Sequence, residues 1–250
     1  MTRYFQWICS IFLGLIIGVA ALKGKDAAGK QIPSNFLTTG AKQFNSTVTL
    51  HNINNWSYWL QWDGVTGRDP QSGDAGGLFS SGAISAVFND GFVWGGIVND
   101  PNSEFQLRVG GSTYISGSVP GYIDANGNPV GPGADSRVRI YRIRKDYLTI
   151  SDTELILEAA ALLNIPISAV TPQNVAAIRE QYARDWQEWP IELGAPFNDL
   201  NQNGIYEPAS GETPGVANAD QVIWFVTNDL NTDAVANFAG SIPMLSLIHI

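Results

Sequence analysis

The stretch VTLHNINNWSYWLQW, from Val48 to Trp62, decides the fold class of this chain. Its second half alternates two sets of side chains, with Trp56, Tyr58, Leu60 and Trp62 in one set and Ser57, Trp59 and Gln61 in the other. β-branched and aromatic residues suit the pleated, half-buried surface of a sheet, and an alternation of period two is that of a strand. The stretch therefore predicts a β-strand.

Similar runs, bounded by turn residues, follow along the chain. Because an Asp-Gly pair accepts the positive φ angles of a tight turn, Asn89-Asp90-Gly91 predicts a hairpin of 84–88 with 92–98. The segment 63–82 is rich in Gly, Asp, Ser and Pro and is predicted to be a long surface loop. Further strands are predicted at Phe105–Val109, Ser112–Ile115, Arg137–Ile143 and Gln221–Thr227, with turns at Gly110-Gly111 and Asp124–Pro129. Strands that follow one another without helices favour an antiparallel core.

The segment from Ser151 to Trp189 has a helical period instead. Ser151 or Asp152 can cap a helix that runs to Leu163, and Thr171-Pro172 can open a second helix through Trp186. We predict a helical hairpin at about 152–187, inserted between strands and laid with its apolar stripe on the sheet. The predicted fold class is mainly β: an antiparallel β-sandwich-like domain with this inserted helical hairpin.

The N-terminal segment predicts export. Arg3 precedes an apolar run from Ile8 to Leu22 that ends in small residues, as signal peptides do. An uncleaved anchor is the alternative, but the run is shorter than the ~20 residues of a spanning helix. The predicted organisation is a signal peptide at 1–21, a flexible lead-in at 22–43 and a single β-rich domain at 44–245, truncated at its C-terminus. The one cysteine, Cys9, lies in the signal, so the mature chain would contain no thiol.

The negative net charge of the chain argues against one class of partner. The chain has 23 Asp and Glu against 14 Lys and Arg, a formal net charge of -9. This charge repels a phosphate backbone, so nucleic acid is not expected as a partner. With 44% hydrophobic and only 15% charged residues, the chain is expected to be globular rather than disordered.

The segment DLNQNGIYEP, from Asp199 to Pro208, carries the most specific chemical pattern. Oxygen-bearing side chains at its first, third and fifth positions, a glycine at the sixth and an acid at the ninth resemble the start of an EF-hand calcium loop. The twelfth position is Ser210 instead of a bidentate glutamate, and Glu212 or Asp220 could complete the shell. The predicted Ca2+ ligands are Asp199, Asn201, Asn203, Ile205 and Glu207.

An Asx-rich turn is the alternative explanation of the same segment. Asp199 and Asn201 would then bond to their own backbone, and Gly204 would take a left-handed conformation. The two explanations differ in whether a cation binds.

No catalytic constellation is predicted. His51 and His249 are the two histidines, too few for a zinc hydrolase, and no Ser or Asp partner of a triad stands near His51 in the sequence. The paired carboxylates of a glycoside hydrolase remain an alternative. The acids that could form such a pair are Asp185, Glu188 and Glu192 after the second helix, and Asp63, Asp69 and Asp74 in the long loop.

An aromatic set raises the possibility of sugar binding. Its members are Trp56, Tyr58, Trp59, Trp62 and Trp94. On one exposed face they could stack sugar rings, whereas aromatics at alternating strand positions more often fill the core. A coplanar row of exposed tryptophans would favour the sugar.

Short motifs spread over residues 45–244 resemble a known group of proteins. They include Asn55-Trp56-Ser57, Phe92–Gly96, Trp189-Pro190, the Asp199 segment and Trp224–Val226. Together they resemble the N-terminal region of large uncharacterised secreted proteins of Gram-negative bacteria, of the kind that often ends in a type IX secretion sorting domain. The resemblance implies secretion and no particular activity. The last residues, 245–250, look like translated sequencing adapter, which predicts that the chain is a fragment.

The expected function follows from compartment and composition. We expect a secreted or cell-surface structural or adhesive module of a larger protein, with no enzymatic activity and with Ca2+ as the candidate cofactor. Its expected partners are cell-surface or extracellular matrix components, including glycans, and after signal cleavage it would not be an integral membrane protein. A carbohydrate-binding module is the first alternative and a glycoside hydrolase the second.

Overall fold

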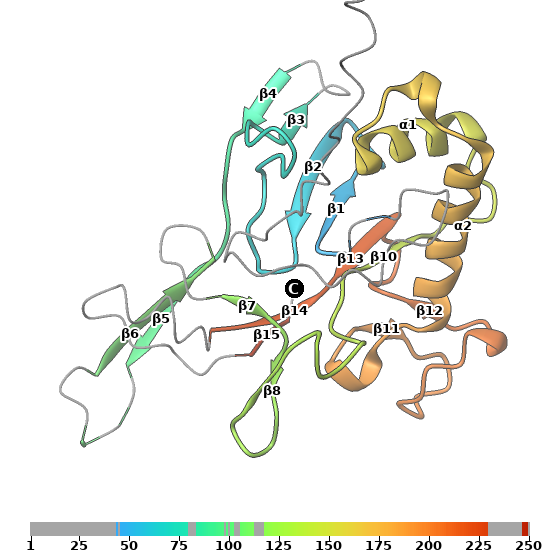
Figure 1. Ribbon diagram of the computed structural model, residues 1–250. Coiled ribbons are helices and arrows are strands. Elements are labelled where there is room, and N and C mark those ends of the chain that lie inside the picture. The colour runs from blue at the N-terminus through green and yellow to red at the C-terminus, as the bar shows by residue number, and fades with distance from the viewer. Residues whose placement is uncertain are drawn as a thin grey trace, which may run out of the picture. The chain divides into compact units, whose positions relative to one another are not determined.

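Strands in antiparallel ladders dominate the computed structural model, which describes residues 44, 46–79, 84–97, 99, 101–102, 106–112, 118–229 and 247–249 (Figure 1). The strands are β1 Val48–His51, β2 Trp56–Gln61, β3 Gly77–Phe79, β4 Ile84–Val87, β5 Val93–Ile97, β6 Leu107–Gly111, β7 Val119–Pro120, β8 Tyr122–Ile123, β9 Pro129–Val130, β10 Tyr141–Arg144, β11 Phe197–Asn198, β12 Thr213–Pro214, β13 Gln221–Trp224, β14 Val226–Asn228 and β15 Leu247–His249. The helices are α1 Asp152–Leu163 and α2 Pro172–Gln187, with 3-10 turns at Ile167–Ala169, Ile191–Leu193 and Pro208–Ser210. The predicted signal peptide at 1–21 and the predicted lead-in at 22–43 lie outside the described residues.

The strands form several small sheets. The largest has four strands in the order β1-β2-β3-β4, and a three-stranded sheet runs β15-β14-β7. The remaining ladders are the pairs β5-β6, β8-β9, β10-β13 and β11-β12. The predicted mainly-β, antiparallel class with a helical insertion is thereby confirmed, while closure of the sheets into a sandwich stays a prediction.

The stretch from Val48 to Trp62 forms a hairpin rather than one strand. β1 pairs with β2 so that Leu50 lies opposite Trp59 and His51 opposite Tyr58. The asparagine-rich segment between them makes the turn, where the Trp56 N–H donates to Asn54 Oδ1 at 2.7 Å. Leu50 and Trp59 are buried together, so one face of this hairpin belongs to the interior.

Of two predictions about segment 63–98, the first is wrong in part, at residues 77–79, and the second is wrong. The predicted surface loop at 63–82 contains β3, which pairs with both β2 and β4. The predicted hairpin around Asn89-Asp90-Gly91 does not form within the described residues, because β4 pairs with β3 and β5 pairs with β6. Asp90 instead exchanges two backbone hydrogen bonds with Thr66, at 3.0 and 2.9 Å. A turn signal is local, whereas the partner of each strand is chosen by residues far away in the sequence.

The helical insertion is confirmed at both helix starts. The Ser151 side chain caps α1 by accepting from the Glu154 N–H, and Thr171 with Asn174 forms a capping box at α2. The two helices pack on each other through a buried apolar cluster of Ile150, Leu155, Ala159, Val175, Ile178 and Tyr182. Neither described helix has the length and apolar character that a membrane crossing requires.

β10 is buried on both faces, and its two faces have opposite chemistry. Tyr141 and Ile143 join an apolar core, while Arg142 and Arg144 alternate with them and are also buried. Arg142 forms an ion pair with Glu158 of α1, which also accepts the Tyr182 hydroxyl of α2 at 3.1 Å. The contact between the helices and β10 is therefore largely ionic, and the apolar stripe predicted to lie on the sheet instead joins the helices to each other.

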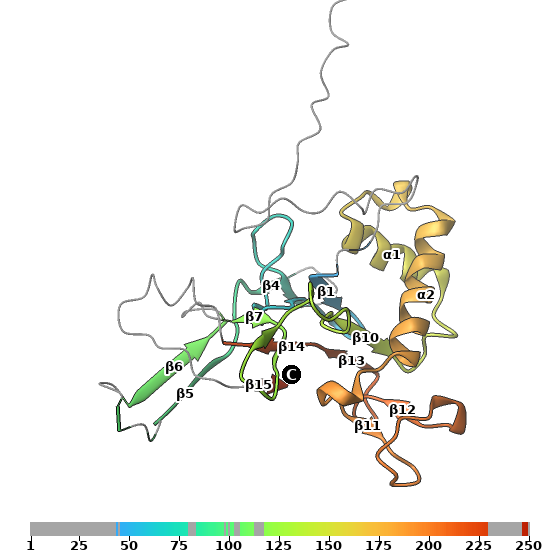
Figure 2. The same ribbon diagram turned by 60° about the horizontal axis from the view of Figure 1, so that its bottom comes forward.

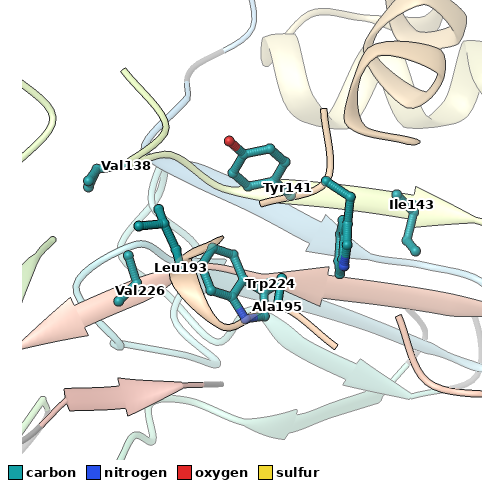
Figure 3. Close-up of a cluster of buried hydrophobic side chains, with 8 residues drawn as sticks. Val138, Tyr141, Ile143, Leu193, Ala195, Trp224 and Val226 are labelled. Atoms are coloured by element: carbon teal, nitrogen blue, oxygen red, sulfur yellow. The ribbon is translucent and has the colours of Figure 1, made fainter. Parts of the chain in front are cut away.

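The aromatic core beside β10 and β13 supports the segment that carries the candidate cation loop. Tyr141 and Trp224 are partners in the ladder, and their ring centroids lie 5.9 Å apart in an edge-to-face arrangement (Figure 3). Trp189 adds a third ring, 6.1 Å from Tyr141, and its Nε1–H donates to the Pro196 carbonyl at 2.7 Å. Because Pro196 directly precedes β11, this bond fixes the start of the β11–β12 ladder, which follows the end of α2 in both views (Figures 1 and 2).

Candidate functional site

The Asp199 loop connects β11 to β12 and has a firm base. Phe197 pairs with Pro214, and Asn198 with Thr213, in the two-residue ladder. The rings of Phe197 and Tyr206 lie 5.6 Å apart, and the Tyr206 hydroxyl donates to the Trp186 carbonyl at 2.7 Å. The loop is thus tied to the end of α2 while residues 201–205 stay exposed.

Asp199 organises the first half of the loop. Its carboxylate accepts the Gly204 N–H at 2.7 Å and the Asn203 N–H at 3.3 Å. Gly204 has a φ of +74°, a conformation that a Cβ would strain. The Gly204 N–H is the main reason that the pKa of Asp199 lies below its ordinary value, so the side chain is a carboxylate at neutral pH.

Three predicted ligands meet at one point of the loop. The amide nitrogens of Asn201 and Asn203 lie 3.0 and 2.9 Å from the same oxygen, Oε2 of Glu207. The oxygen of each amide accepts a backbone N–H, from Asn203 at 3.0 Å for Asn201 and from Ile205 at 2.7 Å for Asn203, so a cation bound by these oxygens would have to displace or share those bonds. Ile205 is held in this turn by its N–H, which donates to Asn203 Oδ1 at 2.7 Å, while its side chain is exposed.

Glu212, rather than Asp220, completes the loop. The 3-10 turn Pro208–Ser210 occupies positions 10 to 12 of the EF-hand pattern, and the chain then returns to pair with β11. Glu212 is 2% exposed, and its two oxygens accept the N–H groups of Leu200 at 3.2 Å and Glu207 at 2.7 Å. Asp220 lies outside the loop and forms an ion pair with Lys145. The position of Glu212, two residues past the expected twelfth, is why spacing alone left it uncertain.

The loop concentrates negative charge without a cationic side chain. Among the described residues, Asp199, Glu207 and Glu212 form no ion pair with Lys or Arg. The residues that the structure describes also include no group of three His, Cys, Asp or Glu side chains placed to hold a metal ion. A cation in the loop would therefore need amide and carbonyl oxygens beside the carboxylates. Such a mixed set of oxygens is what Ca2+ accepts.

The acids considered for glycoside hydrolysis have separate structural roles. Asp185 and Glu188 share one partner, since each forms an ion pair with Arg139. Asp63 and Asp69 accept backbone N–H groups two residues ahead of them, at 3.1 and 2.8 Å, as turn residues do. Glu192 and Asp74 are exposed.

The aromatic set is divided between two faces of the four-stranded sheet. Trp59 is 6% exposed and faces the interior, whereas Trp56 and Tyr58 lie on the opposite face of β2. Trp56 is 37% exposed and packs against Phe79 with ring centroids 5.3 Å apart. Trp62 and Trp94 are half-buried. His51 lies opposite Tyr58, and burial lowers its pKa below the ordinary value.

Comparison with known proteins identified no relative of this chain. A scan against protein-family models, a search of curated proteins and a search of solved structures each found no match. The functional argument therefore rests on the residues themselves.

Proposed function

We propose that this chain is a structural or adhesive module, secreted or held at the outer cell surface, in which Ca2+ bound by the Asp199 loop stiffens the β11–β12 region. The observation that carries the calcium part is the meeting of Asn201, Asn203 and Glu207 at a single point. The apolar leader from Ile8 to Leu22 and the motif resemblance support the extracytoplasmic setting.

Ca2+ would act on the loop through charge. The segment from Asp199 to Glu212 carries three carboxylates, and amides and backbone N–H groups donate to them without neutralising them. A divalent cation would neutralise part of this charge and join residues 199–207 to Glu212. Because the Tyr206 hydroxyl ties the loop to the Trp186 carbonyl, an ordered loop would present a fixed surface to a cell-surface or matrix partner.

Calorimetric titration of the full chain with CaCl2, after treatment with a chelator, tests this proposal. We expect binding heat and a higher melting temperature, with about 2.7 kcal/mol of stabilisation at a Ca2+ concentration 100 times the Kd. Glu207→Gln should abolish both effects. N-terminal sequencing of the exported chain, expected to begin near residue 22, tests the secretion part.

Asp124 provides the matched control. Its carboxylate accepts the N–H groups of Asn126 and Asn128, at 2.9 and 2.8 Å, in a turn of similar sequence that has no equivalent of Glu207. Asp124→Asn should leave the Ca2+ response intact. If the unchanged chain gives no binding heat and melts identically in Ca2+ and in chelator, the Asp199 loop is an Asx-rich turn and the calcium proposal is wrong.

The carbohydrate-binding alternative has weaker support, since Trp59 faces the interior and the tryptophans do not share one exposed face.

A further inference from the structure

A pocket lies between the end of α2, the segment after β12 and the β10–β13 ladder. It has a volume of about 380 Å3, and its lining includes Ile143, Lys145, Trp186, Val216, Asp220 and Val222. This volume is near the lower end of the range of roughly 300 to 1,000 Å3 that small-molecule sites occupy. The lining includes neither the predicted Ca2+ ligands nor Glu212, and nothing in the proposed function uses the pocket.

The apolar wall of the pocket depends on a glycine. Ile143 and Val222 are partners in the β10–β13 ladder, and the chain passes close to both at Gly215, which has a φ of +82°. A Cβ on Gly215 would lie 2.7 Å from Cγ2 of Val222 and 3.1 Å from Cδ1 of Ile143, so any side chain there would clash. The Gly215 N–H donates to the Pro196 carbonyl at 2.8 Å, which holds this segment in place.

The pocket also carries a pair of opposite charges. Lys145 Nζ lies 2.9 Å from Asp220 Oδ1, and both side chains are 66% exposed. The Lys145 N–H donates to the Asp220 carbonyl at 3.0 Å, so the backbone keeps the two residues side by side at the end of the ladder. An ion pair this exposed contributes little to stability, so each partner can turn toward a ligand's charge at little cost.

The chemistry of this lining favours a ligand that carries both charges next to an apolar group. The ammonium of Lys145 suits a carboxylate, and the carboxylate of Asp220 suits an ammonium. An α-amino acid carries these two groups on one carbon, side by side as the ion pair is. Val216 is 62% exposed and Trp186 is half-buried, so apolar surface is left for the ligand's side chain to cover.

We infer that this pocket binds a free α-amino acid with an apolar side chain. Its carboxylate meets Lys145, its ammonium meets Asp220, and its side chain lies against Trp186, Val216 and Val222. The inference does not rest on the calcium proposal, because the two sites share no residue. It differs from the sugar alternative in requiring both charges on the ligand.

L-Phenylalanine and two analogues that each lack one charge provide the probes. Hydrocinnamate lacks the ammonium and phenethylamine lacks the carboxylate, while all three share the aromatic ring. Titrations of the full chain would be followed by calorimetry in the presence of chelator, so that Ca2+ plays no part. We expect phenylalanine to bind about fivefold more tightly than either analogue, and more weakly at high salt.

Two variants should separate the roles of the charges. Lys145→Met should weaken the binding of phenylalanine and hydrocinnamate about fivefold and leave that of phenethylamine unchanged. Asp220→Asn should weaken the binding of phenylalanine and phenethylamine about fivefold and leave that of hydrocinnamate unchanged. Asp152→Asn, which removes an exposed acid from an ion pair outside the pocket, should change none of the three affinities.

The outcomes that contradict the inference are specific. Neither pocket variant is expected to impair folding, because the ion pair is largely exposed, and a melting curve of each variant checks this. Equal binding of phenylalanine and either analogue would overturn the inference. So would variants that leave the affinity for phenylalanine unchanged or weaken all three ligands alike, or an absence of binding heat with millimolar phenylalanine.

Discussion

The carboxylates of two regions of this protein differ in their partners. One region is the contact between the helices and β10, and the other is the Asp199 loop. At the helix contact, Glu158 faces the guanidinium of Arg142, and Asp185 faces that of Arg139. In the Asp199 loop, amides and backbone N–H groups donate to the carboxylates, and no guanidinium of the described residues pairs with them. A guanidinium both neutralises and orients an acid, so the first group is committed to the fold. The second group has no guanidinium partner among the described residues, which is why we propose a cation for it.

Removing a guanidinium from the helix contact should have the largest effect. Arg142 is buried, donates to the Leu50 carbonyl at 3.2 Å and lies 4.9 Å from the centre of the Tyr182 ring. Arg142→Met would leave Glu158 buried without its cation, and we expect a loss of about 3–5 kcal/mol in the free energy of unfolding, measured with urea.

Two further variants sharpen that result. Arg142→Met combined with Glu158→Leu should recover at least half of the loss, because no buried charge is left unpaired. Lys145→Met, which breaks a largely exposed pair with Asp220, should cost under about 1 kcal/mol. A double variant no more stable than Arg142→Met would show that burial of the unpaired acid is not what destabilises the protein.

Within the Asp199 loop, Glu212 and Glu207 should differ when Ca2+ is absent. Glu212 is buried and accepts two backbone N–H groups, so Glu212→Ala should cost about 1–2 kcal/mol in chelator. Glu207 accepts only the two exposed amides of Asn201 and Asn203, so Glu207→Ala should cost under about 0.5 kcal/mol. Urea unfolding measures both. Equal losses would mean that Glu207 is as structural as Glu212, and the contrast between the two regions would weaken.

Asp135 is intermediate between the two regions, because it pairs with a guanidinium, as the acids of the helix contact do, but lies near the surface. Its hydrogen bonds from Arg137 lower its pKa to about 2. A lowered pKa contributes stability above the ordinary value near 3.8, and this contribution is lost as the pH falls through about 2. We expect Asp135→Asn to cost about 1 kcal/mol at pH 6, after allowance for solvent screening, and only a small part of that at pH 2. Unfolding curves at both pH values measure this, and an equal cost at both would show that charge is not the cause.

The parts of the fold that the sequence predicted are those with local causes. Both helices begin where Ser151 and Thr171 can cap them, because a cap depends on residues three positions apart. The turn at Asp124–Pro129 joins β8 to β9 for the same kind of reason. In the candidate site, the Asx-type bonds of Asp199 and Asn201 follow from spacing. Whether Ca2+ binds there remains a prediction.

The features that the sequence missed have distant causes. β3 begins with glycine and has no apolar alternation, and it became a strand because β2 and β4 supply partners on both sides. The alternation Tyr141-Arg142-Ile143-Arg144 is typical of a strand with one face in water. Instead the helices cover the arginine face, since Glu158 and Asp185 come from more than ten positions away to meet it.

Sequence by itself determined that this chain is β-rich, where its helices start and which loop is rich in oxygen-bearing side chains. Those properties depend on backbone preferences and hydrogen bonds that span a few residues. Only the tertiary structure decided which strands pair, which acids are neutralised by arginine and which aromatic rings stay open to solvent. Burial and charge pairing join residues that are remote along the chain, so their outcome depends on the whole packed fold.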